Sequence, residues 1–489
     1  MAQASLIQDM ITQLTEAEST ISLSALLLLS SNTVQVRISA CKFPGWAAMY
    51  CCPLFGERRK MSINVGLIGL GNIGTGVAEY LRDNGNRVGL CLKAAADADS
   101  SKRGNALLPD VLVTDDAYRI IRDPQIQIVI ELIGGEQPAR QFVMEAIDRG
   151  KAVVTANKLT ISKYSRQIFE AARKKGLDFG FEASVGGGIP IIQCLREDLA
   201  ANTISLITGI VNGTTNYILT RMSEGMEYRD ALKTAQEKGF AERDSYLDIS
   251  GQDSRYKLAI LASVAWNTWI DPDSIACEGI AEITPKDIDF AAEFGYAIKL
   301  LATARKHGSK AELRISPTLV SVSHPLTKVL DEFNAIYLEG NLCGPQMYLG
   351  RGAGRLATTS AVIADVMRLA RNIRRGVHDD LPSLHEKLEL AEEAVSGGYF
   401  RLDLKHVPGS LAKVADVLAQ HGISIKDSVQ RNRFRREDAG DIVIPDIITV
   451  EPVGDNRVRK ALEDLEKCAA VSGKPFYLRI EDFSDANVA

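Results

Sequence analysis

The chain lacks an excess of positive charge, a long apolar run and an ordered set of cysteines. Its formal net charge of −5 offers no basic field to attract nucleic acid or anionic lipid. The densest apolar run, residues 26–29, is far shorter than the roughly 20 residues that a membrane-spanning helix needs. We therefore expect no nucleic-acid partner, no membrane partner, and a small-molecule substrate.

The 8 cysteines are scattered, without the spacing of a metal site or of a disulfide framework. Reduced thiols in a cytoplasmic protein are the simplest explanation. With 46 % apolar and 24 % charged residues, the composition is typical of a soluble globular chain with a sizeable core. The length of 489 residues predicts about three domains.

Residues 1–60 differ in character from the rest of the chain and end in a basic stretch at 56–60, directly before Met61. Three interpretations stay open: translation that starts at Met61, a targeting peptide, and an accessory extension. We favour the first, because the segment has neither the order of a signal peptide nor an Arg-rich, acid-free composition. In each case we expect poor packing, so that the segment is disordered or not native.

A strand pattern at residues 63–69 runs into a glycine-rich turn that opens a helix, and a second strand pattern follows at 88–95. Glycine permits a tight turn and lets backbone N–H groups approach a pyrophosphate at the start of a helix. In this context the turn predicts a Rossmann-type NAD(P)-binding domain, and the alternative is a structural strand–helix turn. The turn reads G-L-G-N-I-G and contributes Gly69, Gly71, Asn72, Ile73 and Gly74.

Asp97 follows the second strand, where a carboxylate would hydrogen-bond a ribose 2′-hydroxyl and repel a 2′-phosphate. Lys102 and Arg103 come shortly after it and could instead receive that phosphate. NAD is therefore favoured over NADP, with both left open.

Later strand patterns predict further ligand contacts at the carboxyl edge of a parallel sheet, where such sheets bind ligands. The strand at 126–133 exits into Gly134 and Gly135, and the strand that begins at Val153 ends at Lys158. Lys158 is either a solvated lysine at the start of a helix or a site residue, and its position favours the second interpretation.

Charged residues gather just before and inside an apolar helix between residues 241 and 261. Asp253 and Lys257 are four residues apart and share one helix face, with Glu242 and Asp248 upstream. A lysine near carboxylates and beside apolar walls is a candidate proton donor, because burial lowers the pKa of a lysine. The alternative is an ordinary ion pair on a solvated helix.

Three motifs in this region resemble homoserine dehydrogenases: N-G-T-T-N-Y-I-L at 212–219, A-E-R-D at 241–244, and D-I-S-G-Q-D-S-R-Y-K at 248–257. Ser245 stands where the family has proline. The resemblance implies NAD(P)-dependent interconversion of L-aspartate 4-semialdehyde and L-homoserine, in the route to threonine, methionine and isoleucine. Two rival hypotheses are another NAD(P)-dependent amino-acid dehydrogenase and a catalytically inactive amino-acid sensor.

The resemblance also implies roles for the charged residues. Lys257 would protonate the alkoxide, and Asp253 would orient Lys257 and contact the substrate. Glu242 and Asp248 would bind the substrate's ammonium group. Lys158 would lie between nicotinamide and substrate and counter the developing negative charge.

Two glycine-containing segments carry further implications of the resemblance. The segment 182–190, which otherwise reads as a turn between domains, would hold a monovalent cation, Na⁺ or K⁺, through backbone carbonyls. The segment 350–362 would return the chain to the nucleotide domain, with Gly352 near the cofactor. The carbonyls are those of Glu182, Val185, Gly187 and Ile189.

Beyond the site, residues 284–305 predict an amphipathic helix region that packs in the core or forms a subunit interface. Strands are expected at 313–322 and 335–339, His324 should cap a helix, and 378–395 reads as a polar helical linker.

From Gly398 the pattern becomes β-α-β-β-α-β and resembles an ACT domain, with P-G-S-L-A at 408–412. His406 stands where the family usually has an acid. The resemblance implies an amino-acid effector, with threonine as the candidate, and the alternative is a dimerisation module without a ligand.

The predicted fold class is α/β, in three domains, and we expect a homodimer or homotetramer. The boundaries are an extension at 1–60, a Rossmann-type domain at 61–190, an α+β substrate and dimerisation domain at 191–378 whose last part (350–378) returns to the nucleotide domain, a linker at 379–397, and a ferredoxin-like ACT domain at 398–482.

Overall fold

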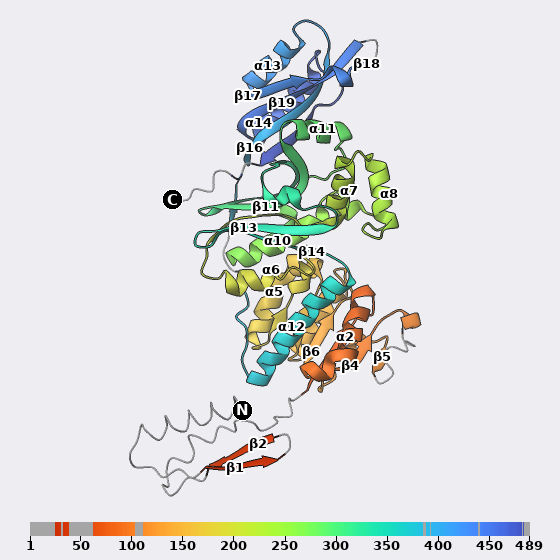
Figure 1. Ribbon diagram of the computed structural model, residues 1–489, viewed down its shortest axis with the longest axis vertical. Helices are drawn as coiled ribbons and strands as arrows, with labels where there is room; N and C mark the ends of the chain where they lie inside the picture. The colour runs from red at the N-terminus through yellow and green to blue at the C-terminus, as the bar shows by residue number, and fades with distance from the viewer. Residues whose placement is uncertain are drawn as a thin grey trace, which may run out of the picture. The chain divides into compact units, whose positions relative to one another are not determined.

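The computed structural model describes residues 62–102, 111–384, 388–391, 393–438, 441–481 and 483, together with two strands in the first 60 residues (Figure 1). The chain divides into two compact units, 1–60 and 61–489. In the first unit, β1 (Ala25–Ser30) and β2 (Thr33–Ile38) pair as an antiparallel hairpin, which the sequence analysis did not predict. No helix among the described residues is long and apolar enough to cross a membrane.

A six-stranded parallel sheet, in the order β5-β4-β3-β6-β7-β8, forms the half of the second unit that was predicted to bind a nucleotide, and we name it the nucleotide half. This is the Rossmann strand order, whose switch point lies between β3 and β6. Both faces of the sheet are covered, so its strands are nearly continuous apolar runs. Its elements are β3 (Ile63–Ile68), α2 (Asn72–Val88), β4 (Leu90–Ala96), β5 (Leu112–Thr114), α3 (Ala117–Ile121), β6 (Ile128–Glu131), α4 (Ala139–Asp148), β7 (Ala152–Thr155), α5 (Lys158–Lys174) and β8 (Phe179–Gly180).

Helix α12 (Arg355–Arg375) brings the chain back to this sheet and packs beside α2 (Figure 1). A Cβ added to Gly76 of α2 would lie 2.5 Å from Thr359 Oγ1, so the two helices approach closely there. Buried Val362, Val366 and Leu369 join the core under β3.

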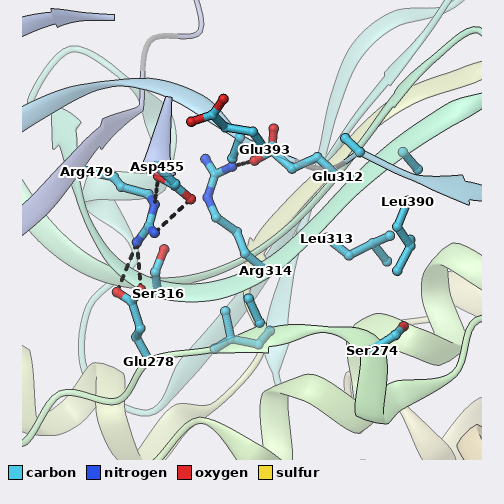
Figure 2. Close-up of a pocket in the computed structure, with 15 residues that line it drawn as sticks. Ser274, Glu278, Glu312, Leu313, Arg314, Ser316, Leu390, Glu393, Asp455 and Arg479 are labelled. Carbon is cyan, nitrogen blue, oxygen red and sulfur yellow. Dashed lines mark hydrogen bonds and ion pairs between the residues drawn. The ribbon is translucent and has the colours of Figure 1, made fainter. Parts of the chain in front are cut away.

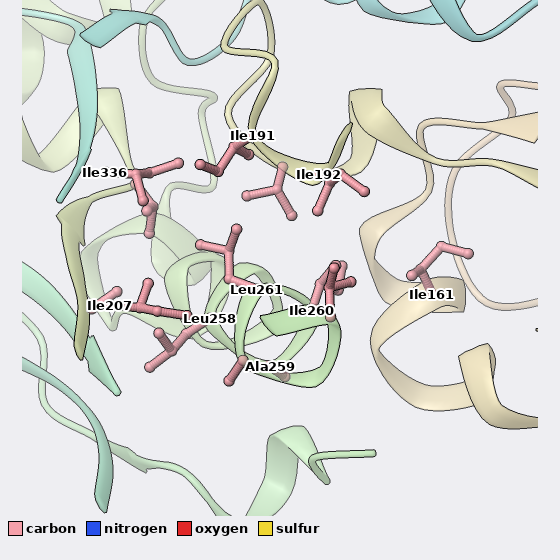
Figure 3. Close-up of a cluster of buried hydrophobic side chains, with 14 of the residues drawn as sticks. Ile161, Ile191, Ile192, Ile207, Leu258, Ala259, Ile260, Leu261 and Ile336 are labelled. Carbon is pink, nitrogen blue, oxygen red and sulfur yellow. The ribbon is translucent and has the colours of Figure 1, made fainter. Parts of the chain in front are cut away.

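A 12-stranded sheet forms the rest of the unit, and its main path runs β14-β13-β9-β11-β12-β20-β16-β19-β17. Helix α10 (Gln252–Trp266) packs its apolar residues against this sheet and the nucleotide half (Figure 3). The first part of the sheet contains β9 (Ile204–Ile210), β10 (Ala276–Cys277), β11 (Tyr296–His307), β12 (Lys310–Ser321), β13 (Phe333–Gly340) and β14 (Gly344–Arg351), with helices α6 (Ile191–Gln193), α7 (Gly213–Ser223), α8 (Tyr228–Glu237), α9 (Tyr246–Ile249) and α11 (Pro285–Glu293).

Apart from the short strands β15 and β18, the C-terminal elements follow one another as β-α-β-β-α-β, the order predicted from residue 398 onward. The four long strands lie in the order β20-β16-β19-β17 and pair antiparallel. Strand β20 also pairs in parallel with β12, so this sheet continues the one before it. The elements are β15 (Glu389–Leu390), β16 (Val395–Lys405), α13 (Ser410–Gln420), β17 (Ile425–Gln430), β18 (Arg436–Asp438), β19 (Asp441–Gly454), α14 (Asp455–Lys467) and β20 (Phe476–Glu481).

Two local predictions were wrong. Only Pro285–Glu293 of the expected helix region 284–305 is helical, because Gly295 at φ +77° ends it and β11 follows. The described part of 378–395 contains no helix; Glu389–Leu390 form the short strand β15, which pairs in parallel with β12. His324 caps the short helix Pro325–Lys328 through Nδ1, as predicted.

Candidate active site

The glycine turn leaves the start of α2 open. Gly71 caps the helix without a side-chain hydrogen bond, and a Cβ added to Gly71 would meet nothing within 4 Å. By contrast, a Cβ on Gly74 would lie 1.9 Å from the carbonyl oxygen of Gly69, which itself has φ +103°. Two of the glycines therefore build the turn, and the third leaves room for a pyrophosphate beside the N–H groups of Asn72 and Ile73, the first two residues of the helix.

Asp97 lies beside this turn at the end of β4. Its carboxylate accepts hydrogen bonds from Leu70 N at 2.6 Å and Asp99 N at 2.9 Å, and Lys102 Nζ lies 3.2 Å away. Burial alone would raise the pKa of Asp97, but these hydrogen bonds and Lys102 outweigh it and lower that pKa. Asp97 and Lys102 thus lie together where the ribose of the cofactor is predicted to bind. Arg103 lies outside the described residues.

Polar residues fix the loops after β6 and β7. Glu131, fully buried, accepts hydrogen bonds from Thr155 Oγ1 at 2.6 Å and Ile133 N at 2.9 Å, and burial raises its pKa. Asn157 caps α5 by accepting from Thr160 N at 3.1 Å and donates to Gly135 O at 2.7 Å. Lys158 is therefore held as the first residue of α5, at the carboxyl edge of the sheet.

One carboxylate joins two lysines from different halves of the unit. Asp253 Oδ1 lies 2.7 Å from Lys158 Nζ, and Asp253 Oδ2 lies 2.7 Å from Lys257 Nζ. Lys257 Nζ also donates to Val211 O at 2.7 Å. The side chains of Asp253 and Lys257 are only 7 % and 11 % exposed, so the interpretation as a solvated surface pair is wrong.

The charges of this cluster stabilise one another. Burial alone would raise the pKa of Asp253, but Lys257 and Lys158 lower it far below its usual range. Burial alone would lower the pKa of Lys158, but Asp253, and Asp248 and Glu242 beyond it, raise it. Lys158 is 43 % exposed at its side chain and charged at neutral pH, so it can neutralise an anion that develops beside it.

Asn212 holds the two aspartates in place. Its Oδ1 accepts from Thr215 N at 2.9 Å, which caps α7, and its Nδ2 donates to Asp248 Oδ1 at 2.7 Å and Asp253 Oδ2 at 2.9 Å. Burial raises the pKa of Asp248, and the charge of Asp253 adds to the increase. The sequence analysis saw the motif around Asn212 but assigned it no contact.

Glu242 lies in the exposed loop between α8 and α9. Its carboxylate has no hydrogen bond or ion pair to the residues that the structure describes, yet it is close enough to raise the pKa of Lys158. Its carboxylate is therefore available to a cation beside the cluster.

A buried amide lies where the returning chain meets the sheet. Asn334 on β13 is 1 % exposed, and neither of its side-chain polar atoms has a partner among the described residues. A Cβ on Gly352 would lie 1.8 Å from Asn334 Nδ2, and a Cβ on Gly187 would lie 2.5 Å from the carbonyl carbon of Gly352. Gly352 is thus required by packing, whatever its relation to a cofactor, and Asn334 gave no sequence signal.

The carbonyl loop at 182–189 is buried except at Gly188. The carbonyls of Glu182 and Ile189 accept from Val185 N and Ile191 N, whereas those of Val185 and Gly187 accept nothing from the described residues. The Glu182 carboxylate instead accepts from Ile192 N and Gln193 N, both at 2.8 Å. Burial, with Asp365 nearby, raises the pKa of Glu182 to about 7.

A Rossmann-order sheet with an open glycine turn, whose carboxyl edge faces a lysine–carboxylate cluster, defines a nicotinamide-dependent dehydrogenase. Residues 69–182 match the family model "Homoserine dehydrogenase, NAD binding domain", and residues 190–367 match the model "Homoserine dehydrogenase". The chain belongs to the homoserine dehydrogenase family, and it is an oxidoreductase.

The match extends over nearly the whole length of each of three relatives. A homoserine dehydrogenase of Neisseria gonorrhoeae is 37 % identical over 437 residues, which is 86 % of this chain and 99 % of its own. The crystal structure of a homoserine dehydrogenase from Thiobacillus denitrificans has 37 % identity and a TM-score of 0.80, over 86 % of this chain and 98 % of its own. A hyperthermophilic archaeal homoserine dehydrogenase mutant in complex with NADPH has 25 % identity and a TM-score of 0.56, over 64 % and 98 %.

Proposed function

We propose that the chain interconverts L-aspartate 4-semialdehyde and L-homoserine with NAD or NADP, in the route to threonine, methionine and isoleucine. The observation that carries this proposal is the carboxylate of Asp253, which lies 2.7 Å from both Lys158 and Lys257. It joins the nucleotide half to helix α10, and two lysines held on one carboxylate supply the charge stabilisation that hydride transfer to an aldehyde requires.

In the proposed mechanism Lys257 Nζ donates a proton to the oxygen of the semialdehyde as that oxygen gains negative charge. The bound nicotinamide supplies the hydride in this direction and accepts it in reverse. Asp253 and Val211 O orient the Lys257 ammonium by accepting its other hydrogen bonds. Lys158 stabilises the developing alkoxide by its charge.

Glu242 and Asp248 are the proposed partners of the substrate's ammonium group. Glu242 has a carboxylate without a partner among the described residues, and Asp248 is held by Asn212 at 2.7 Å. Opposite charge then orients the amino end of the substrate away from the lysines and its aldehyde end toward them.

Both nicotinamide cofactors are proposed substrates. Asp97 favours a ribose 2′-hydroxyl, whereas Lys102 at 3.2 Å from it can turn toward a 2′-phosphate. The NADPH in the archaeal relative supports the use of NADP here as well.

The carbonyl loop fits a monovalent cation, Na⁺ or K⁺. Two of its buried carbonyls, those of Val185 and Gly187, have no hydrogen bond from the described residues, and a hard cation takes oxygen ligands. With Glu182 and Ile189 these carbonyls would hold the ion and stiffen the loop that packs on Gly352.

The C-terminal elements are proposed to form a ferredoxin-like ACT domain that binds threonine, following a linker at 379–397. Their β-α-β-β-α-β order supports this, as does the turn at 408–412, where Gly409 at φ +86° precedes α13. That turn lines a cavity of about 500 Å³. We also propose a homodimer or homotetramer that acts in the cytoplasm.

The experiment that tests the function is homoserine-dependent reduction of NAD⁺ and of NADP⁺, each with and without threonine. Turnover with either cofactor supports the reaction. The ratio of the two rates shows whether Asp97, which favours NAD⁺, or Lys102, which favours NADP⁺, determines the cofactor preference. Absence of turnover with both would favour another amino-acid dehydrogenase or a sensor.

A further inference from the structure

A buried positive charge usually needs a carboxylate partner, and Lys299 on β11 has none among the described residues. Arg479 on β20 shows the usual arrangement, because it is 9 % exposed and pairs with both Glu278 and Asp455 (Figure 2). Lys299 is 4 % exposed, and its ammonium donates to one side-chain amide and one backbone carbonyl. The contacts of these two oxygens therefore show what Lys299 holds in place.

Lys299 joins helix α7 to the segment 329–333, which leads into β13. Lys299 Nζ donates to Asn216 Oδ1 at 3.1 Å and to Val329 O at 2.7 Å. Asn216, in the first turn of α7, is 2 % exposed, and its Nδ2 lies 3.2 Å from Val329 O, 2.9 Å from Asp331 O and 3.2 Å from Phe333 O. Lys299 and Asn216 thus supply the donors for carbonyls of this segment that point toward the helix.

Two further contacts fix α7 against the same segment. A Cβ on Gly213, the first residue of α7, would lie 2.5 Å from Glu332 O, so the segment and the helix start are in close contact. Thr220 Oγ1 donates to Asn216 O at 2.7 Å and accepts from Asp331 N at 3.1 Å. The first two turns of α7 are therefore tied to the segment by hydrogen bonds as well as by packing.

The start of α7 in turn holds the aspartates of the candidate active site. Asn216 N donates to Asn212 O at 3.3 Å, as the first backbone hydrogen bond of the helix. Asn212 Nδ2 donates to Asp248 Oδ1 at 2.7 Å and to Asp253 Oδ2 at 2.9 Å. Asp253 Oδ2 also lies 2.7 Å from Lys257 Nζ. A displacement of the first turn of α7 would therefore move the amide that orients both aspartates.

We propose that Lys299 is a positioning residue of the active site, which fixes the start of α7 and thereby Asn212 and the two aspartates that Asn212 holds. The inference rests on the proposed reaction, because it takes Asp248 and Asp253 as groups that act on the substrate. It gives a role to a buried lysine that acts only through Asn216.

The fold should survive the loss of this ammonium. Burial lowers the pKa of Lys299 to about 8, and Asp331 is the one charged group among the described residues whose field opposes that decrease. The folded chain therefore binds this proton more weakly than the unfolded chain, so the ammonium is held at a cost in stability at neutral pH. Lys299→Met removes this cost together with two hydrogen bonds, and methionine has a similar volume.

Lys151 offers a matched control. It is also 4 % exposed, donates to Asp123 O at 2.6 Å and Ile126 O at 2.7 Å, and has its pKa lowered by burial. It directly precedes β7, whereas Lys158 follows that strand, so it lies at the edge of the sheet away from the catalytic cluster. Lys151→Met removes a comparable buried ammonium without touching α7.

The readouts are kcat/KM for homoserine at saturating cofactor and the Kd for cofactor, both with the full chain. Lys299→Met should lower kcat/KM for homoserine by at least about tenfold, because a small misplacement of catalytic groups can cost about 10²-fold. The Kd for cofactor should change less than about twofold, and Lys151→Met should change both quantities less than about twofold. Circular dichroism with thermal unfolding establishes that each variant is folded at the assay temperature.

Two further variants test the route. Asn216→Ala and Lys299→Met break the same link, so the double variant should lie within about twofold of Asn216→Ala alone. Thr220→Val keeps the shape of the side chain and every buried charge, but it breaks the other link between α7 and Asp331. It should lower kcat/KM for homoserine by at least about threefold, and it decides the question if Lys299→Met does not fold.

Four outcomes overturn the inference: kcat/KM for homoserine stays within about twofold in Lys299→Met, it falls as far in Lys151→Met, the affinity for cofactor falls in step with it, or the effects of Lys299→Met and Asn216→Ala multiply. If Lys299→Met does not fold, unchanged kinetics in Thr220→Val overturns it. Turnover of homoserine by the wild-type chain leaves the proposed reaction intact in each case. Absence of that turnover would instead overturn the proposed function.

Discussion

Replacing Lys257 by methionine tests the proposed proton donor most directly. The side chain is 11 % exposed, and methionine fills its buried slot with similar volume and no proton to give. Loss of a positioned acid costs about 10²- to 10⁴-fold in rate, or about 2.7–5.4 kcal/mol in the barrier. We therefore expect kcat to fall by that factor, with KM for homoserine and the affinity for cofactor nearly unchanged.

The fold should survive Lys257→Met. Asp253 keeps Lys158 at 2.7 Å and Asn212 Nδ2 at 2.9 Å, so no unpaired charge is left buried. Val211 O loses its donor, which costs about 1–3 kcal/mol of unfolding free energy, below the roughly 3–5 kcal/mol of a stranded charge. The matched control is Lys163→Met on α5, which breaks a partly exposed pair with Glu136 and should cost at most about 1 kcal/mol.

Steady-state kinetics in both directions, cofactor titration by fluorescence and urea unfolding supply the measurements. A variant that keeps kcat within about threefold of the wild type has lost less than 1 kcal/mol of barrier stabilisation and would refute the assignment of Lys257. A loss of cofactor affinity equal to the loss of rate would also refute it, because the damage would then be structural.

Further predictions concern stability and the cofactor. Burial raises the pKa of Asp446 to about 6, above the unfolded value of about 3.9, so the free energy of unfolding should fall as pH rises between these two values. Asp446→Asn should remove up to about 3 kcal/mol of that pH-dependent fall, measured by urea unfolding between pH 4 and 7. Gly74→Ala should lower both thermal stability and cofactor affinity, since its Cβ would meet Gly69 O at 1.9 Å, whereas Gly71→Ala should lower cofactor affinity alone. Asp97→Ala should raise the NADP⁺ to NAD⁺ ratio of kcat/KM by about tenfold in parallel assays.

Local features of the chain were predictable because neighbouring residues determine them. The turn from Gly69 to Gly74 needs glycine for reasons of backbone geometry within a few residues, so strand, turn and helix were predicted together. The placement of Lys158 at the start of α5 likewise follows from the strand before it. The family resemblance assigned Lys158 and Asp253 to the same substrate, but their ion pair was not predicted, because periodicity carries no information on contacts between distant segments.

Features set by long-range pairing escaped prediction. Residues 298–304 have the pattern of a helix face, yet they form the centre of β11 between β9 and β12, where both faces of the strand are buried. The parallel pairing of β20 with β12 could not be predicted from the sequence, because it depends on how the whole sheet is assembled. Asn334 was missed for a similar reason, because a single asparagine in a strand pattern does not indicate a functional role until its neighbours in space are known.

The start of α10 contacts both the nucleotide half and strand β12. Asp253 in its first turn pairs with Lys158 of the nucleotide half, and Gly251 before it packs on Ile315 of β12. A shift of β12 therefore reaches the carboxylate that orients Lys257 before it reaches the glycine turn, which lies on the other sheet. An effector that acts through β12 should accordingly change kcat more than the affinity for cofactor, and an effector that changed only cofactor affinity would have to act along another route.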